Sequence, residues 1–185
     1  MKKIWAGTLV ALLGAGTWVS PVRAQDGVYH PFELNVHVGS VNLDFTDEHQ
    51  FMAGGRALFS LPNGLGVGGN IDWVNTELAT VYLYSGEINL TIPMGLPADL
   101  ILSAGIGAIS ISPEDEEDDE APVTVEDETS TMVPLGVGVR WQDRTGAPPW
   151  IGYRFDLRDN VIFPDEDFDN NTHNWEFSGG VSLLF

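Results

Sequence analysis

Apolar and polar residues alternate along almost the whole chain, and this period of two limits the fold more than any other feature. Such a period places successive side chains on opposite faces of a strand. Residues 173–185 show it most clearly, because the odd positions from Trp175 to Phe185 are Trp, Phe, Gly, Val, Leu and Phe, while most of the even positions are polar. No stretch has a convincing apolar stripe at helical spacing, so the pattern predicts an all-β protein.

Eight segments carry the alternation, and they predict eight strands. Their approximate ranges are 32–43, 50–61, 67–73, 82–92, 100–112, 133–141, 151–158 and 173–185. We expect a bulge at Gly39 and Ser40 to shift the phase of the first strand. The fifth strand is apolar on both faces, so its phase stays open. An even number of strands with hairpin-length connections indicates an antiparallel up-and-down barrel.

The first 24 residues have the organisation of a secretory signal peptide. Lys2 and Lys3 precede an apolar run of 16 residues, and the letters VRA precede the expected cut before Gln25. The alternative, a membrane anchor, is disfavoured because a helical span needs about 20 residues. We therefore expect a signal peptide at 1–24 and one barrel domain at 25–185. The chain has no cysteine, so no disulfide supports it.

The charge of the chain is strongly negative. Loss of residues 1–24 would remove three of its eight basic residues and none of its 27 acidic ones, which changes the formal charge from −19 to −22. This sign disfavours nucleic-acid binding, which depends on basic residues that neutralise phosphates.

Whether the apolar or the charged face of the strands points into the barrel depends on the free energy of exposing or burying each face. A soluble barrel of the lipocalin type would turn its apolar face inward around a ligand. Here the opposite face carries the charges, and an apolar face turned to water would exceed the few hundred Å² that soluble monomers expose. Facing inward, opposite charges must pair. We therefore predict a transmembrane barrel whose lumen holds an ion-pair network formed by Arg56, Arg140, Arg154, Arg158, Glu33, Asp72, Glu87, Asp156 and Glu176.

The length of the strands agrees with a membrane span. Ten steps from Trp175 to Phe185 cover roughly 33 Å, and a tilt of about 40° reduces this to roughly 25 Å, the height of an outer-membrane apolar band. The connections after the second, fourth and sixth strands are short, whereas the others are polar. This asymmetry is typical of outer-membrane barrels with both termini on the periplasmic side.

These features together resemble the small OmpA-like and OmpX-like outer-membrane β-barrels. The resemblance rests on the signal peptide, the eight alternating strands and a last strand that ends in GGVSLLF. It implies a monomer in a Gram-negative-type outer membrane, in contact with lipid and lipopolysaccharide. It also implies a signal for the barrel-assembly machinery in the last strand, formed by Trp175, Phe177, Val181, Leu183 and Phe185.

Enzymatic motifs are weak in this sequence. Gly64, Gly66 and Gly69 have a G-x-G-x-x-G spacing, but a strand rather than a helix is expected to follow them. Some barrels of this size are lipid A deacylases or acyltransferases, which need a Ser and His pair. The nearest candidates, His173 and Ser178, lie on opposite faces of the expected strand. We therefore expect no enzyme.

The acidic connections are the candidate metal ligands. Asp165, Asp167 and Asp169, with Glu176, have the oxygen spacing of a calcium loop, but Asn170 stands where the sharp turn needs glycine. Glu176 is also expected to point into the barrel. Weak Ca²⁺ or Mg²⁺ binding at this loop and at residues 114–128 is one hypothesis, and a solvated loop without ions is the other. No other cofactor is expected.

Two functions remain from the sequence. One is a non-enzymatic structural or surface-interaction protein with a plugged, ion-paired lumen and acidic extracellular loops. The other is a narrow channel for ions or small polar solutes. Inward glycines would leave water-sized gaps for such a path, at Gly54, Gly68, Gly86, Gly136, Gly138 and Gly180.

Overall fold

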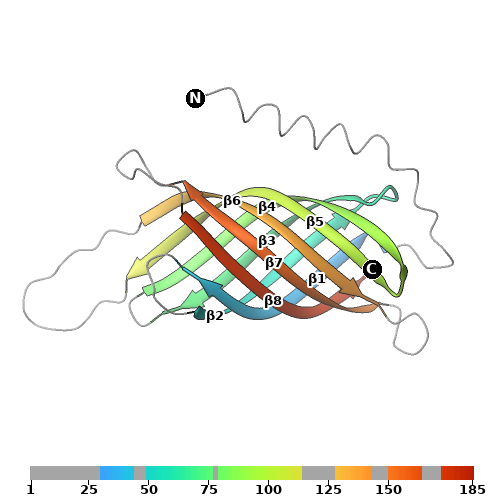
Figure 1. Cartoon of the computed structure of the whole chain (residues 1–185), viewed down its shortest axis with the longest axis horizontal. Helices are drawn as coiled ribbons and strands as arrows, with labels where there is room; N and C mark the ends of the chain where they lie inside the picture. The colour runs from blue at the N-terminus through green and yellow to red at the C-terminus, as the bar shows by residue number, and fades with distance from the viewer. Residues whose placement is uncertain (1–29, 44–48, 77–78, 114–127, 143–149, 164–171) are drawn as a thin grey trace, which may run out of the picture.

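A computed structural model describes residues 30–43, 49–76, 79–113, 128–142, 150–163 and 172–185. These residues form eight strands (Figure 1), which are β1 (Phe32–Asn42), β2 (His49–Ser60), β3 (Leu65–Asn75), β4 (Ala79–Leu96), β5 (Ala98–Pro113), β6 (Glu128–Trp141), β7 (Ile151–Phe163) and β8 (Thr172–Leu184). Within the described ranges, no helix is long and apolar enough to cross a membrane.

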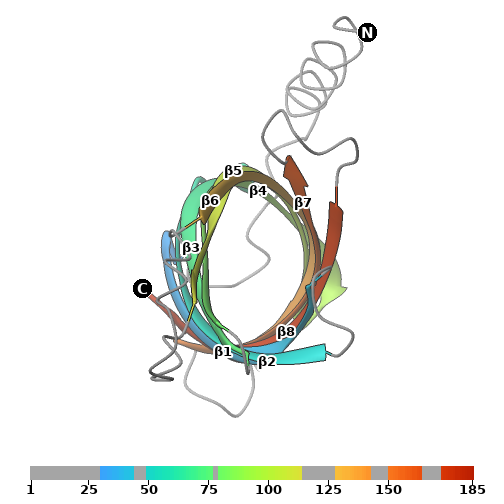
Figure 2. The ribbon, with the colours of Figure 1, turned by 90° about the vertical axis from the view of Figure 1, so that its left-hand side faces the viewer.

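The strands close into one barrel in chain order, each antiparallel to its neighbours. Figure 2 shows the ring of strands around a central interior. The ring closes where β1 pairs with β8, and the main chains of Phe32 and Phe185 exchange two hydrogen bonds of 3.2 and 2.9 Å. A closed ring leaves no unpaired strand edge. The prediction of an eight-stranded antiparallel up-and-down barrel is therefore confirmed.

Three local predictions need correction or completion. The expected bulge at Gly39 and Ser40 is wrong, because β1 keeps one continuous register with β2 through both residues. The segment after the fourth strand was expected to be a turn, but most of it belongs to β4. This strand continues to Leu96, with an irregular register between Pro93 and Leu96. The open phase of β5 is now fixed, because Ile101 is buried while Ile106 on the other face is exposed.

The outer surface of the barrel is apolar and its inner surface is largely polar. On β1, Val36 is 72% exposed, whereas the neighbouring inward residues Asn35 and His37 are 2% and 3% exposed. On β8, Phe177 is 59% exposed and the adjacent Glu176 is 1% exposed. The large exposed apolar side chains occur on all eight strands, so together they form a continuous belt suited to hydrocarbon rather than water.

A layer of buried apolar side chains, which the sequence pattern did not predict, lies near one end of the lumen. The layer lies at the end where β1, β3, β5 and β7 finish, opposite Phe185. Its buried members are Val41, Leu43, Met52, Val74, Val81, Leu83, Ile109 and Met132. These residues share the inward phase of the charged residues further along the same strands. The ion pairs therefore give way to mostly apolar side chains toward this end, where Asn160 and Asn174 are also buried.

Candidate functional site in the barrel lumen

The first group of lumen charges is centred on Arg140, at the end of the barrel that holds the C-terminus. Its Nη1 and Nη2 atoms lie 2.8 Å from Glu33 Oε2 and 2.8 Å from Asp99 Oδ2. Glu33 lies on β1, Asp99 on β5 and Arg140 on β6, so the arginine ties together strands from distant parts of the chain. The Ser182 hydroxyl on β8 also donates to Glu33 Oε1 at 2.7 Å.

A second group lies around Asp156 on β7. Arg154 Nε donates to Asp156 Oδ2 at 2.9 Å, and Arg56 Nη1 from β2 donates to the same oxygen, also at 2.9 Å. Arg154 Nη1 lies 3.5 Å from Glu33 Oε1, which joins this group to the first. The single negative charge of Asp156 thus balances only one of the two buried guanidinium charges. Glu33, through Arg154, helps to balance the other.

A third group is centred on Arg158, further toward the apolar layer. Its Nη1 and Nη2 atoms form a bidentate contact with Glu87 of β4, at 2.9 and 3.0 Å. Its contact with Glu176 is much looser, because Arg158 Nε lies 3.9 Å from Glu176 Oε1. Glu176 accepts weaker neutral hydrogen bonds, from Asn160 at 3.2 Å and from Ser178 at 3.3 Å.

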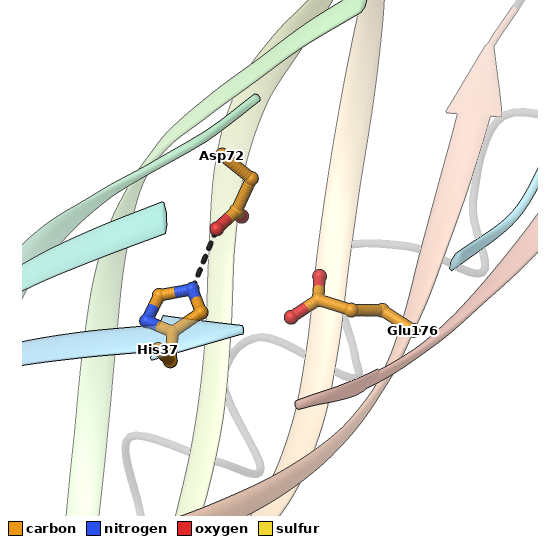
Figure 3. Close-up of side chains that lie close together, drawn as sticks. All are labelled: His37, Asp72 and Glu176. Carbon is orange, nitrogen blue, oxygen red and sulfur yellow. Dashed lines mark hydrogen bonds and ion pairs between the residues drawn. The ribbon is translucent and has the colours of Figure 1, made fainter. Parts of the chain in front are cut away.

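The last group contains no arginine. His37 Nε2 lies 2.6 Å from Asp72 Oδ1, and Asp72 also accepts a hydrogen bond from the Asn70 side chain. Figure 3 shows the ring of His37 turned toward Asp72, with the carboxylate of Glu176 pointing toward these two side chains. One ligand atom from each of His37, Asp72 and Glu176 lies within 4.8 Å of the others, and all three residues are buried.

A glycine makes this contact possible. In the register, His37 of β1 faces Gly54 of β2, and Gly54 faces Asp72 of β3. A Cβ atom at Gly54 would collide with both Asp72 Oδ1 and His37 Nε2. On its other side, His37 pairs with Gly180 of β8, where a Cβ would lie 2.7 Å from the His37 Cβ. The histidine therefore occupies a slot between two residues without side chains.

The residues expected in the lumen have the following positions. All nine charged residues named from the sequence lie inside the barrel, in the four groups above. Asp99 was missed because it stood in a segment interpreted as a turn, although its phase matches Ile101 two residues later. The His37–Asp72 contact was missed because the two residues are 35 positions apart and meet only through the register of β1, β2 and β3. Gly86, expected inward, faces outward and has open space around it.

The other candidate residues have simpler positions. The five residues of the expected assembly signal all point outward from β8 or follow it, with Trp175 and Phe185 exposed. Asp165, Asp167 and Asp169 lie outside the described residues. Their proposed companion Glu176 points into the lumen. Gly64 lies in the turn before β3 with a φ of 86°. The strand expected after these glycines is present, whereas the nucleotide-binding motif needs a helix at that place.

Comparisons with solved structures agree on the fold. The chain is similar to Neisserial surface protein A, with a TM-score of 0.62 and 17% identity over 84% of this chain and 97% of that one. It is similar to the N-terminal β-barrel domain of Pseudomonas aeruginosa OprF, with a TM-score of 0.57 and 12% identity over 83% and 97% of the two chains. A major outer membrane protein from Thermus thermophilus gives 0.50 and 15% identity over 84% and 100%.

At these identities the likeness shows the fold, which is that of the small eight-stranded outer-membrane barrels. The resemblance to OmpA-like and OmpX-like barrels is confirmed at this level. No protein-family model matches the chain, and no curated protein sequence matches it either.

Proposed function

We propose that the chain is an outer-membrane barrel with a closed interior, which acts as a non-enzymatic structural or surface-interaction protein. One observation carries this proposal: two different barriers follow each other along the lumen. The arginines and carboxylates form ion pairs in one part of the lumen, and the apolar layer lies toward the end opposite Phe185. An eight-stranded barrel has an interior only wide enough for its own side chains.

The outer-membrane location is supported by the surface and by the fold. Every strand pairs on both sides, so its main-chain polar groups are satisfied without water. The exposed apolar belt matches hydrocarbon, and the solved barrels of this fold are outer-membrane proteins. We therefore propose contacts with lipid and lipopolysaccharide as a monomer. The outward aromatic residues of β8 are the proposed signal for the assembly machinery.

The proposed surface role belongs to the connections at the end opposite the C-terminus. The acidic residues 114–127 connect β5 to β6 at that end, and residues 164–171 connect β7 to β8 there. With both termini on the periplasmic side, these connections face the outside of the cell. Their negative charge suits partners with cationic groups, and weak binding of Ca²⁺ or Mg²⁺ belongs to the same proposal.

A narrow channel is the second candidate, and one observation favours it. Several buried polar atoms in the lumen have no hydrogen-bond partner among the described residues, including both side-chain atoms of the Asn89 amide and the Nε and Nη2 atoms of Arg56. Groups of this kind are commonly satisfied by buried water. The closed-lumen proposal implies that water at these positions makes no continuous path, and the apolar layer toward one end of the barrel supports this.

Electrical recording of the refolded chain in planar bilayers separates the two functions. We expect no unitary current from the native chain. The double variant Leu83→Ala with Ile109→Ala removes two side chains of the apolar layer, and it is expected to raise brief, small conductances. Its matched control is Leu102→Ala, which shortens an outward-facing leucine of β5. Stable unitary currents from the native chain would overturn the closed-lumen proposal and establish the channel.

A further inference from the structure

We infer that His37, Asp72 and Glu176 form a binding site for a divalent transition-metal ion of the zinc class inside the barrel. The three side chains come from β1, β3 and β8, and each is no more than 3% exposed. They offer one imidazole nitrogen and two carboxylate oxygens within 4.8 Å of one another (Figure 3). This site is independent of the acidic connections and of the role proposed above.

The hydrogen-bond directions indicate that the neutral imidazole faces Asp72 with its unprotonated nitrogen, the one able to bind a metal ion. Glu33, paired with Arg140, can only accept, so the Ser182 hydroxyl donates to it. Ser182 Oγ therefore accepts from Asn35 Nδ2 at 3.0 Å, which leaves Asn35 Oδ1 facing His37 Nδ1 at 2.9 Å. The proton of the neutral ring consequently lies on Nδ1.

With that tautomer, the lone pair of His37 Nε2 faces Asp72 Oδ1 at 2.6 Å. Two acceptors at this distance repel unless a cation lies with them, either a second proton on the ring or a metal ion. Metal-binding histidines commonly have this arrangement, in which one ring nitrogen donates to an oxygen of the protein and the other binds the ion. Here Asn35 provides that oxygen.

The charge balance of the lumen favours a divalent ion. Its described side chains include four arginines and six carboxylates, namely Arg56, Arg140, Arg154, Arg158, Glu33, Asp72, Glu87, Asp99, Asp156 and Glu176. Within the described part of the chain, no arginine forms an ion pair with Asp72, and Glu176 has only the 3.9 Å contact with Arg158. Both unneutralised charges are thus at the proposed site. A protonated His37 offsets one of them, whereas a divalent ion offsets both.

The surroundings supply a further ligand. Gly54 has no side chain, and the side chains of His37 and Asp72 meet in the volume that a Cβ atom there would occupy. Asn70, which donates to Asp72 through Nδ2, has a buried Oδ1 atom without a hydrogen-bond partner among the described residues. Zinc ligands at about 2.0–2.2 Å in a tetrahedron lie about 3.3 Å apart. To bind zinc, the side chains of Asp72 and Glu176 must therefore rotate while the strands remain in place. This rotation lengthens the 2.6 Å distance between His37 Nε2 and Asp72 Oδ1 and shortens the longer distances between the ligand atoms.

The donor set selects the class of ion. Calcium and magnesium prefer six or more oxygen ligands, including water. One imidazole with two carboxylates and an amide oxygen suits zinc, and it suits cobalt as a spectroscopic substitute. The proposed ion is structural, since it joins β1, β3 and β8 across the lumen.

The test uses the mature chain, refolded in detergent with and without Zn²⁺ so that the ion can enter before the barrel closes. Calorimetric titration and metal analysis should give one tightly bound zinc per chain, and Co²⁺ should give the visible absorption bands of a low-coordinate site. His37→Gln and Glu176→Gln should each weaken binding by about tenfold or more. The matched control is His173→Gln, which removes an exposed histidine 2.8 Å from Asp159.

A second measurement protects the test against variants that fold poorly. Zinc should raise the thermal midpoint of the native chain and of His173→Gln, but not that of His37→Gln. The inference is overturned if the native chain binds no stoichiometric zinc, or if His37→Gln binds as tightly as the native chain. It is also overturned if the His37 ring signals in nuclear magnetic resonance respond to pH and not to zinc, because a proton alone then occupies the contact.

Discussion

Replacement of Asp156 by Asn should strongly destabilise the barrel, because this carboxylate is shared by two buried arginines. Arg56 and Arg154 both contact its Oδ2 atom at 2.9 Å, and their side chains are 1% and 0% exposed. Without Asp156, Arg154 keeps only Glu33 at 3.5 Å. Arg56 has no other ion pair among the described residues. Asparagine preserves the shape of the side chain, so the change isolates the charge.

The magnitude follows from the burial of the two arginines. Removal of one partner of a buried ion pair costs about 3–5 kcal/mol, and the amide oxygen that remains places this case near the lower limit. The matched control is Asp159→Asn, which makes the same chemical change three residues after Asp156, on the outer face of β7. The side chain of Asp159 is 17% exposed and that of its partner His173 is 58% exposed. Solvent reaches this pair through His173, so we expect it to contribute about 0–1 kcal/mol.

Urea unfolding in detergent, followed by tryptophan fluorescence, measures both variants. With a slope of about 1–3 kcal/mol per molar urea, Asp156→Asn should lower the midpoint by about 1–3 M at unchanged slope. Asp159→Asn should leave it within the error of the measurement. Equal midpoints for the two variants would refute the reasoning, since they would mean that water screens the lumen charges as well as it screens those on the surface.

Two further predictions use the same assay. Gly54→Ala should cost about 1–3 kcal/mol because its methyl group enters the His37–Asp72 contact, whereas Gly86→Ala, in open space, should stay within about 0.5 kcal/mol; equal costs would contradict the tight contact. In lipid vesicles, Val36→Arg at the middle of the exposed belt should cost about 2–4 kcal/mol, and Leu61→Arg near the strand end about 0–1 kcal/mol. If Val36→Arg leaves the free energy of unfolding unchanged, this face of the barrel does not contact lipid.

The period of two was sufficient to predict the eight strands and the inward side of nine charged residues, although it missed Asp99. It could not predict which charges meet. Arg56 and Asp156 are 100 positions apart, and their contact depends on the stagger of strands around the ring. His37 meets Asp72 only because Gly54 stands between them in register. A single sequence contains these residues but not the register that brings them together.

The apolar layer escaped prediction for a different reason. Val74 and Leu83 occupy the inward phase of strands whose other inward residues are mostly polar, so in the sequence they look like breaks in the alternation. In the barrel they meet similar residues from neighbouring strands and form a separate layer. The pattern of one strand therefore identifies a face, whereas the composition at one height of the barrel appears only when all strands are aligned.

The alignment of the strands also places the proposed metal site directly next to the apolar layer. Asp72 pairs in register with Leu83, and Glu176 pairs with Val41; both apolar partners belong to the layer. Carboxylates beside such side chains lose hydration on that side, so an unneutralised charge there costs more than one near Arg140 at the other end. The apolar layer thus increases the demand for a cation at His37, Asp72 and Glu176. The closed interior and the ion are separate proposals, but both follow from the order of the inward-facing residues along the barrel.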